Sequence, residues 1–307
     1  YMLFLFFEHK LEFKKECFEY CFVSADKSKK LYYWINWSGI PVKIDVNRKG
    51  KKLEYFGENL FDKNIGDSQF KYNVIDFDGL VTGFKKIGLT NGDVVLVHSS
   101  FKSLGEVKGG PQKVVDALVS VVGEKGTVIF PNFNFDFSRY GTTWNIKDTP
   151  SHMGIISEFA RKDPRSLKVF HPIYSFSIIG KHAEKLVKNK YKGGYSKESV
   201  FNKLRILDGK IIHIDTIYKG STFFHHVEEM VQVDYKFFKE FTGFVIDKNE
   251  KKINDTFELY VRDLDRGIVT DVTKISKILE KKEIMKNGEI GDATVWYMKA
   301  EDVFQCT

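Results

Sequence analysis

Between Asp76 and Thr216 the chain alternates short apolar runs with amphipathic segments of helical spacing. The runs GDVVLVHSS, GTVIFPNF and GKIIHIDT are rich in β-branched residues, which is typical of strands buried on both faces. The segment 109–126 opens with two glycines and Pro111, then carries apolar residues at 114, 115, 118, 119 and 122, one face of a helix. This repetition of strand, glycine-containing loop and helix predicts an α/β layered fold.

Helical and strand patterns continue to alternate to the end of the chain. A helix ending at Gly88, a helix capped by Ser151 and a helix capped by Ser221 or Thr222 are predicted. The segment 239–262 alternates around a DKNEKK turn, which indicates an antiparallel hairpin. Further helices are expected in 182–189, 199–209 and 272–284, and further strands in 171–180 and 293–302.

Residues 1–75 have a different character. They are rich in aromatic residues, and LYYWINWSGIPVKIDV, NRKGK and KLEYF suggest short strands with a glycine-containing turn, either a hairpin or a small meander. We therefore expect a small β-rich N-terminal extension (1–75) and an α/β domain (76–307). The role of the extension is left open between a substrate-recognition lobe, a dimer element and a protein-docking module.

Composition excludes several classes of protein. With 42% hydrophobic and 29% charged residues and only 6 prolines, the 307-residue chain fits neither disorder nor a collagen-like repeat. The apolar run 1–7 is far shorter than the ~20 residues of a membrane span and lacks the basic start of a signal peptide. Three cysteines, Cys17, Cys21 and Cys306, form no CxxC pair, which favours a reduced, cytoplasmic setting without a membrane partner.

The net charge of +7 is spread along the chain. Nucleic-acid binding would need clustered basic residues interleaved with aromatics, and the densest run, 48–52, is interpreted as a hairpin tip. A diffuse positive excess instead favours small anionic ligands such as coenzyme phosphates.

Three clusters carry candidate chemistry. In 97–111 a buried strand leads through serines and glycines into a helix, where free backbone N–H groups would suit a phosphate, although GxxxxGK[ST] is absent. In 170–176 His171 precedes Pro172 at the start of a strand. In 221–230 His225 and Glu228 share one helical face, as do His226 and Glu229, and only one pair is expected to point inward.

Other chemistries are less well supported. His213, Asp215, His225 and Glu228 could supply metal ligands, but HExxH is missing, so no metal is expected. No GxSxG motif is present and no cysteine lies beside a glycine loop, which disfavours an acyl-enzyme.

In this order and spacing, the three clusters resemble the aminoglycoside 3-N-acetyltransferase family, the coenzyme-A-dependent group unrelated in fold to the GNAT enzymes. The matching stretches are VHSSFKSLGEVKGGPQKVVDAL, GTVIFPNFNFDF, DTPSHMGIISEFARKDPRSLKVFHPIYSFSIIG, LDGKIIHID and STFFHHVEE, within about 77–304. The resemblance implies a mixed central sheet flanked by helices, with a cleft at one end of the sheet. It also implies acetyl-CoA as donor and an amine as acceptor.

Roles follow by matching motifs. His225 and Glu228, in the TxxHxxE pattern that begins at Thr222, resemble the catalytic base and its polar partner. The residues that resemble the coenzyme contacts are Ser99, Ser100, Phe101, Lys102, Ser103, Gly109, Gly110, His171, Tyr174 and Ser175. Thr222 and the acidic residues Asp136, Asp148 and Glu158 are the candidate contacts for the acceptor.

The expected mechanism is direct attack of a deprotonated amine on the thioester in a ternary complex. Because the chain is basic, and because FFHHVEE and YVRDLDRG resemble a surface-polysaccharide branch, the preferred acceptor is a nucleotide-linked or glycan amino sugar. The alternatives are an aminoglycoside, which would confer antibiotic resistance, an inactive coenzyme-binding module, a hydrolase and an O-acyltransferase. A homodimer is left open.

Overall fold

The computed structural model describes residues 73–307 except 189 and 217–220, and the backbone of five strands within 6–56. The chain divides into two units, Tyr1–Lys71 and Tyr72–Thr307. In the first, the strands form one antiparallel sheet in sequence order: β1 (Phe6–Phe7), β2 (Cys17–Val23), β3 (Lys30–Asn36), β4 (Pro41–Arg48) and β5 (Lys51–Phe56). Arg48 of β4 pairs with Lys51 of β5, and the residues between them, where the turn is predicted, lie outside the described residues. The domain boundary at 75 and the role of the extension stay predictions.

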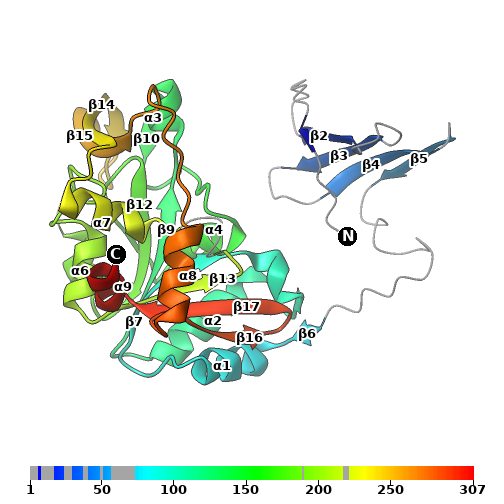
Figure 1. Ribbon diagram of the computed structural model, residues 1–307, viewed down its shortest axis with the longest axis horizontal. Coiled ribbons are helices and arrows are strands. Elements are labelled where there is room, and N and C mark those ends of the chain that lie inside the picture. Colours follow the sequence, from blue (N-terminus) through cyan, green and yellow to red (C-terminus); the bar gives the residue numbers. More distant parts are fainter. Residues whose placement is uncertain are drawn as a thin grey trace. The chain divides into compact units, whose positions relative to one another are not determined.

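A seven-stranded mixed sheet forms the centre of the second unit (Figure 1). Its order is β11 (Leu167–Lys168), β12 (Tyr174–Gly180), β9 (Thr127–Phe133), β7 (Val94–Ser99), β13 (Lys210–Ile214), β17 (Ala293–Lys299) and β16 (Lys286–Ile290). The three inner strands β9, β7 and β13 are parallel, and the outer pairings are antiparallel. The mixed α/β architecture expected from the sequence is therefore confirmed.

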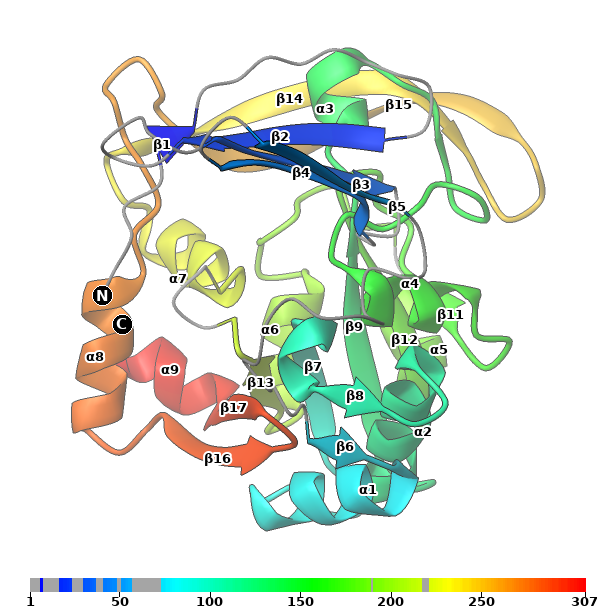
Figure 2. The ribbon, with the colours of Figure 1, turned by 90° about the vertical axis from the view of Figure 1, so that its right-hand side faces the viewer.

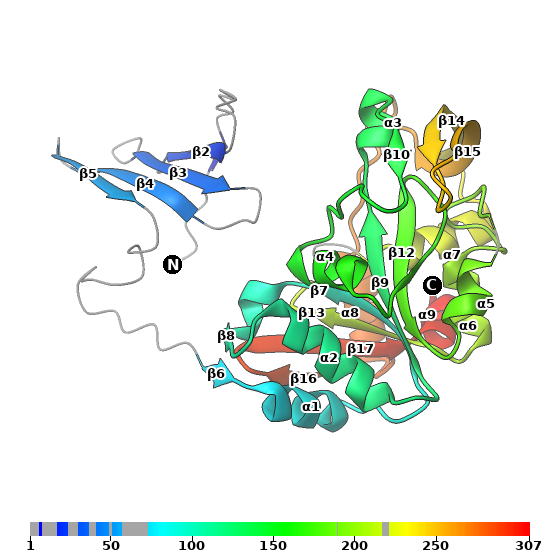
Figure 3. The same ribbon diagram turned by 180° about the vertical axis from the view of Figure 1, so that it is seen from behind.

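Both faces of the sheet are buried. Because successive residues of a strand point to opposite faces, each strand contributes side chains to two core clusters. Val94 and Leu96 of β7 belong to the first core cluster, whereas Val95 and Val97 belong to the second, on the opposite face. The second cluster is covered by α1 (Phe77–Lys86), α2 (Pro111–Val122) and α4 (Ile155–Lys162), which lie in front in Figure 3. The first is covered by α5 (Ala183–Val187), α6 (Val200–Ile206), α7 (Phe223–Val231), α8 (Thr273–Lys281) and α9 (Ala300–Cys306).

A long hairpin extends beyond one end of the central sheet (Figure 2). It consists of β14 (Lys236–Ile246) and β15 (Lys252–Arg262), as the alternating pattern predicts, and β10 (Trp144–Asn145) pairs with β14 in parallel. Aromatic residues from the hairpin, from α3 (Asp136–Tyr140) and from β10 form a third apolar cluster. A small parallel pair, β6 (Val74–Ile75) and β8 (Glu106–Val107), completes the described strands.

One predicted helix start is wrong. Helix α4 begins at Ile155 after Gly154, because Ser151 uses its hydroxyl to accept the N–H of Met153 and not to cap a helix. Thr222, one of the two residues predicted to cap the next such helix, does occupy the N-cap position of α7, although its side chain makes no capping bond. Within the described residues, no helix is both long and apolar enough to cross a lipid bilayer.

Candidate active site

Helix α7 places His225 and Glu228 side by side. Phe223, Phe224 and Val227 are buried, and this apolar face anchors the helix on the first core cluster. Being three residues apart, His225 and Glu228 share the neighbouring face. Their side chains are each 20% exposed, and His225 Nδ1 lies 2.6 Å from Glu228 Oε2. The predicted contact between the two side chains is thus present.

Two further donors hold the carboxylate of Glu228. The hydroxyl of Tyr235 donates to Oε1 at 3.1 Å, and the ammonium of Lys236, whose side chain is 2% exposed, bonds to Oε2. Burial alone would raise the pKa of Glu228, but the contacts with His225 and Lys236 outweigh it and lower that pKa to about 2. Glu228 is therefore ionised across the physiological range.

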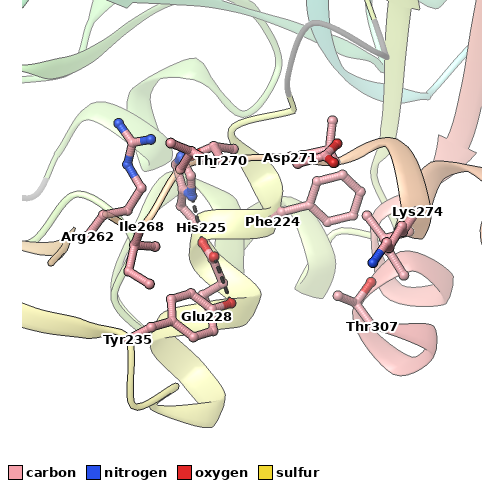
Figure 4. Close-up of a pocket in the computed structure, with 13 residues that line it drawn as sticks. Phe224, His225, Glu228, Tyr235, Arg262, Ile268, Thr270, Asp271, Lys274 and Thr307 are labelled. Atoms are coloured by element: carbon pink, nitrogen blue, oxygen red, sulfur yellow. Dashed lines mark hydrogen bonds and ion pairs between the residues drawn. The ribbon is translucent and has the colours of Figure 1, made fainter. Parts of the chain in front are cut away.

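His225 and Glu228 line a pocket of about 390 Å³ between α7, the base of the hairpin and α8 (Figure 4). Figure 4 shows the connected side chains of His225, Glu228 and Tyr235 along one wall. The other lining residues are Phe224, Arg262, Ile268, Val269, Thr270, Asp271, Val272, Lys274, Ile275 and Thr307. Burial lowers the pKa of His225, with Lys236 and Arg262 acting in the same direction and Glu228 opposing them. A neutral imidazole, the form that accepts a proton, is the result.

The second histidine and glutamate of α7 behave differently. His226 is fully buried, and its Nδ1 lies 2.5 Å from the carbonyl oxygen of Tyr195. Glu229 is also buried, with a pKa raised to about 7 by burial and by Glu258. Of the two pairs, His226 and Glu229 are buried, whereas the side chains of His225 and Glu228 are each 20% exposed. It is nevertheless His225 that pairs with a carboxylate and lines the pocket.

The loop proposed for the coenzyme follows β7. Phe101–Leu104 form a short 3-10 helix that includes Lys102, and Ser99 and Ser100 precede it. Gly109 and Gly110 have φ of +83° and +72°, which favour glycine, and α2 then begins at Pro111 without a side-chain cap. The N–H groups of that first helical turn suit a phosphate.

Loops after two neighbouring parallel strands meet at this end of the sheet. Ser103, after β7, has its hydroxyl 2.9 Å from Ser100 Oγ and 2.7 Å from Asp215 Oδ2, which follows β13. Carboxyl ends of parallel strands are a common location for ligand sites in α/β folds. Asp215 contacts the loop of Ser100 and Ser103, whereas sequence reasoning named it only as a possible metal ligand.

The three residues 171, 174 and 175 are directed largely into the protein. His171 is buried, its Nδ1 accepts the N–H groups of Ile173 and Tyr174 at 3.1 and 2.9 Å, and burial lowers its pKa to about 3. The buried hydroxyl of Ser175 donates to the carbonyl of Val169. These bonds explain why the segment is ordered, and a coenzyme role for it stays a prediction.

Tyr174 connects this segment to α7. The centroid of its half-buried ring lies 4.7 Å from the ring centroid of Tyr195. The ring centroid of Tyr195 lies in turn 5.2 Å from that of His225. Aromatic side chains therefore link the start of β12 to the histidine of α7.

The acidic residues predicted to bind the acceptor have other partners. Asp136 Oδ2 lies 3.6 Å from His152 Nε2, and Asp148 accepts a bond from Asn145. Glu158 binds Arg161 through both carboxylate oxygens. None of the three lines the pocket at His225, and neither does Thr222, whose carbonyl accepts the N–H of His225. Their roles toward an acceptor stay predictions.

Replacing Glu158 with glutamine is expected to lower the free energy of unfolding by about 1–3 kcal/mol at pH 7, because buried Arg161 loses its charged partner. Contacts with Arg161, Ser151 and Lys162 outweigh burial and lower the pKa of Glu158 to about 2. The wild-type advantage is therefore complete above the usual carboxyl range and disappears as the pH falls toward 2. Urea unfolding at pH 7 and at pH 3 measures it, and an equal difference at both would contradict the assignment.

The candidate metal ligands do not gather. His213 stacks on His98 with ring centroids 4.7 Å apart, and its two nitrogens lie 3.1 Å from the hydroxyls of Thr216 and Ser221. Asp215 contacts Ser103, and His225 contacts Glu228. Among the described residues, no three His, Cys, Asp or Glu side chains are placed to hold a metal ion together.

A family model described as aminoglycoside 3-N-acetyltransferase matches residues 96–307. The aminoglycoside N(3')-acetyltransferase-like protein YokD of Bacillus subtilis is 32% identical over 166 residues, 47% of this chain and 61% of that protein. Aminoglycoside N(3)-acetyltransferase VII of Streptomyces paromomycinus is 26% identical over 50% of this chain and 60% of its own length. The chain thus spans about three-fifths of these two relatives.

Solved structures share the fold. AAC-IIIb in binary complex with CoASH superposes with a TM-score of 0.69 at 20% identity, covering 76% of this chain and 94% of that one. AAC-VIa bound to sisomicin gives a TM-score of 0.67 at 21% identity, covering 76% and 95%.

Proposed function

Because the chain belongs to the aminoglycoside 3-N-acetyltransferase family, we propose that it transfers the acetyl group of acetyl-CoA to an amino group of an aminoglycoside. The observation that carries the proposal is the contact between His225 and Glu228 in the wall of a pocket. Relatives and solved structures that resemble the chain are named for this activity, which supports the aminoglycoside over the nucleotide-linked amino sugar favoured by sequence reasoning.

The residues present fit a coenzyme at the end of the sheet. Gly109 and the uncapped first turn of α2 offer backbone N–H groups to a phosphate, although the N–H of Gly110 donates to the carbonyl of Val107. Ser100 and Ser103, on the loop after β7, carry hydroxyls that contact each other. Acetyl-CoA supplies the thioester when bound. The chain's own contribution is to hold that group and to manage the proton of the acceptor amine.

The chemistry assigned to His225 is proton transfer. An acceptor amine is largely ammonium near pH 7 and has no lone pair until it loses a proton. His225 takes that proton, the neutral nitrogen bonds to the carbonyl carbon, and the carbon–sulfur bond then breaks. The imidazolium returns its proton to the departing thiolate, the nitrogen loses its second proton to solvent as the amide forms, and no acetyl-enzyme forms. Holding both reactants in one complex replaces a bimolecular encounter.

A nucleotide-linked or glycan amino sugar is the second candidate, because the pocket wall at His225 carries Arg262 and Lys274. Counted with the buried Lys236, which bonds to Glu228, the cations Lys236, Arg262 and Lys274 outnumber the carboxylates Glu228 and Asp271 by one, which favours an acceptor with an anionic group over a polycation. Surface-polysaccharide biosynthesis would be the setting for such an acceptor.

A thiol-release assay with acetyl-CoA tests the proposal. The purified full-length chain is assayed against kanamycin- and gentamicin-type aminoglycosides and against a panel of nucleotide-linked amino sugars. We expect thiol release that requires an amine and that chelator leaves unchanged. Turnover of aminoglycosides alone would reject the second candidate, turnover of nucleotide sugars alone would reject the first, and no release with any amine would overturn the proposed activity.

A further inference from the structure

A buried lysine lies within the contact between His225 and Glu228. Lys236 is the first residue of β14, and its cross-strand partner is Arg262 of β15. Its ammonium bonds to Glu228 Oε2 and lies 3.0 Å from His225 Nδ1. A lysine is rarely buried without a charged partner, and here the partner is Glu228. The ion pair therefore connects the hairpin to α7 beside the candidate base.

The hydrogen-bond donors and acceptors around His225 indicate which ring nitrogen carries the hydrogen. A lysine ammonium has donors only, so His225 Nδ1 either accepts from Lys236 or donates to Glu228. The contact with the carboxylate is shorter, 2.6 Å against 3.0 Å, and a carboxylate has lone pairs for both donors. We therefore place the hydrogen on Nδ1, directed to Glu228, which leaves the lone pair on Nε2.

Tyr235 completes the arrangement. Its hydroxyl occupies the other carboxylate oxygen of Glu228, so three donors from α7 and from the start of the hairpin fix the carboxylate. Glu228 without a neighbouring cation would favour an imidazolium at His225. The ammonium of Lys236 already balances that carboxylate and repels a second positive charge.

We propose that Lys236 is a positioning residue that keeps His225 neutral, with Nε2 able to accept a proton from the acceptor amine, in mildly acidic as well as neutral solution. The proposal rests on the proposed function, in which His225 is the base. It goes beyond the pair of residues recognised from the sequence, because the third group comes from the hairpin, remote from every motif singled out there.

Several other titratable groups surround His225. They are Glu228 from its own helix, Tyr235 and Lys236 at the start of the hairpin, Arg262 of β15, Tyr195, and Asp271 and Lys274 on the far side of the pocket. Of these, Lys236 is the cation that contacts both His225 and Glu228. Burial and Lys236 both lower the pKa of His225, which agrees with the geometry.

Substituting Lys236 with methionine or glutamine is expected to raise the pKa of His225 by about one unit or more, because the imidazolium loses a repelling neighbour and keeps Glu228. NMR titration of the imidazole measures this without any assay of activity, and His225→Gln assigns the resonance. The acid limb of kcat/KM moves upward by the same amount. One unit below the raised pKa, kcat/KM falls about 10-fold from its plateau.

Two controls separate charge from packing. Lys239→Met removes an exposed lysine from the same strand and should leave the pKa of His225 unchanged, and Lys236→Arg should restore a near-wild-type titration. An unchanged pKa in both uncharged variants would overturn the proposal. If both unfold, a wild-type pKa of His225 above about 6.5 overturns it and a lower one supports it. A wild type that releases no thiol would overturn the proposed function instead, while the titration still decides the role of Lys236.

Discussion

His225→Ala is expected to lower kcat about 100-fold or more while leaving coenzyme affinity nearly unchanged. Because Nδ1 is engaged by Glu228, Nε2 is the nitrogen that can take a proton from the acceptor. Alanine leaves the ammonium form of the acceptor without a base, whereas the glycine loop before α2 keeps its own contacts. Thiol release at saturating substrates gives kcat, and calorimetric titration gives the Kd of coenzyme A.

A matched control comes from a histidine outside the pocket. His182 stands at the start of α5, and His182→Ala should preserve kcat. Unchanged turnover in His225→Ala would remove this residue from the role of base. A parallel loss of coenzyme affinity would show instead that the substitution disturbs the fold around α7.

Periodicity was sufficient to predict the elements that carry the site. The continuous apolar run of β7 and the apolar face of α2 after Pro111 are sequence patterns that predict buried elements, and both elements are buried. Elements at the periphery were harder, and β16 was missed because its sequence, KNGEI, is an exposed edge strand without an apolar face. The start of α4 was misplaced because Ser151 bonds within its own turn and so imitates a cap.

Tertiary partners explain what sequence reasoning could not find. The spacing of His225 and Glu228 predicts their contact, because both lie on one helix. Lys236 reaches them only because the hairpin folds back on α7, and no local pattern distinguishes it from Lys239, which is exposed on the same strand. Spacing alone also could not separate His225 from His226, which is fully buried and has its Nδ1 beside the carbonyl oxygen of Tyr195.

The position of α7 depends on an aromatic cluster beneath it. Phe201 of α6 is fully buried, and its ring lies 6.2 Å from that of Phe223 and 6.5 Å from that of His226, both on α7. It also meets Phe176 of β12 at 5.3 Å. One side chain therefore joins the sheet, α6 and the helix that carries the candidate base.

Phe201→Ala is accordingly expected to lower the free energy of unfolding by about 3–5 kcal/mol, the loss typical of a large aromatic removed from a packed core. That is a large part of the total stability of a domain. The midpoint of urea unfolding measures the change, and Ile206→Ala, on the same helix but 74% exposed, should cost less than about 0.5 kcal/mol. Equal costs for the two variants would mean that α6 does not pack on α7 through Phe201.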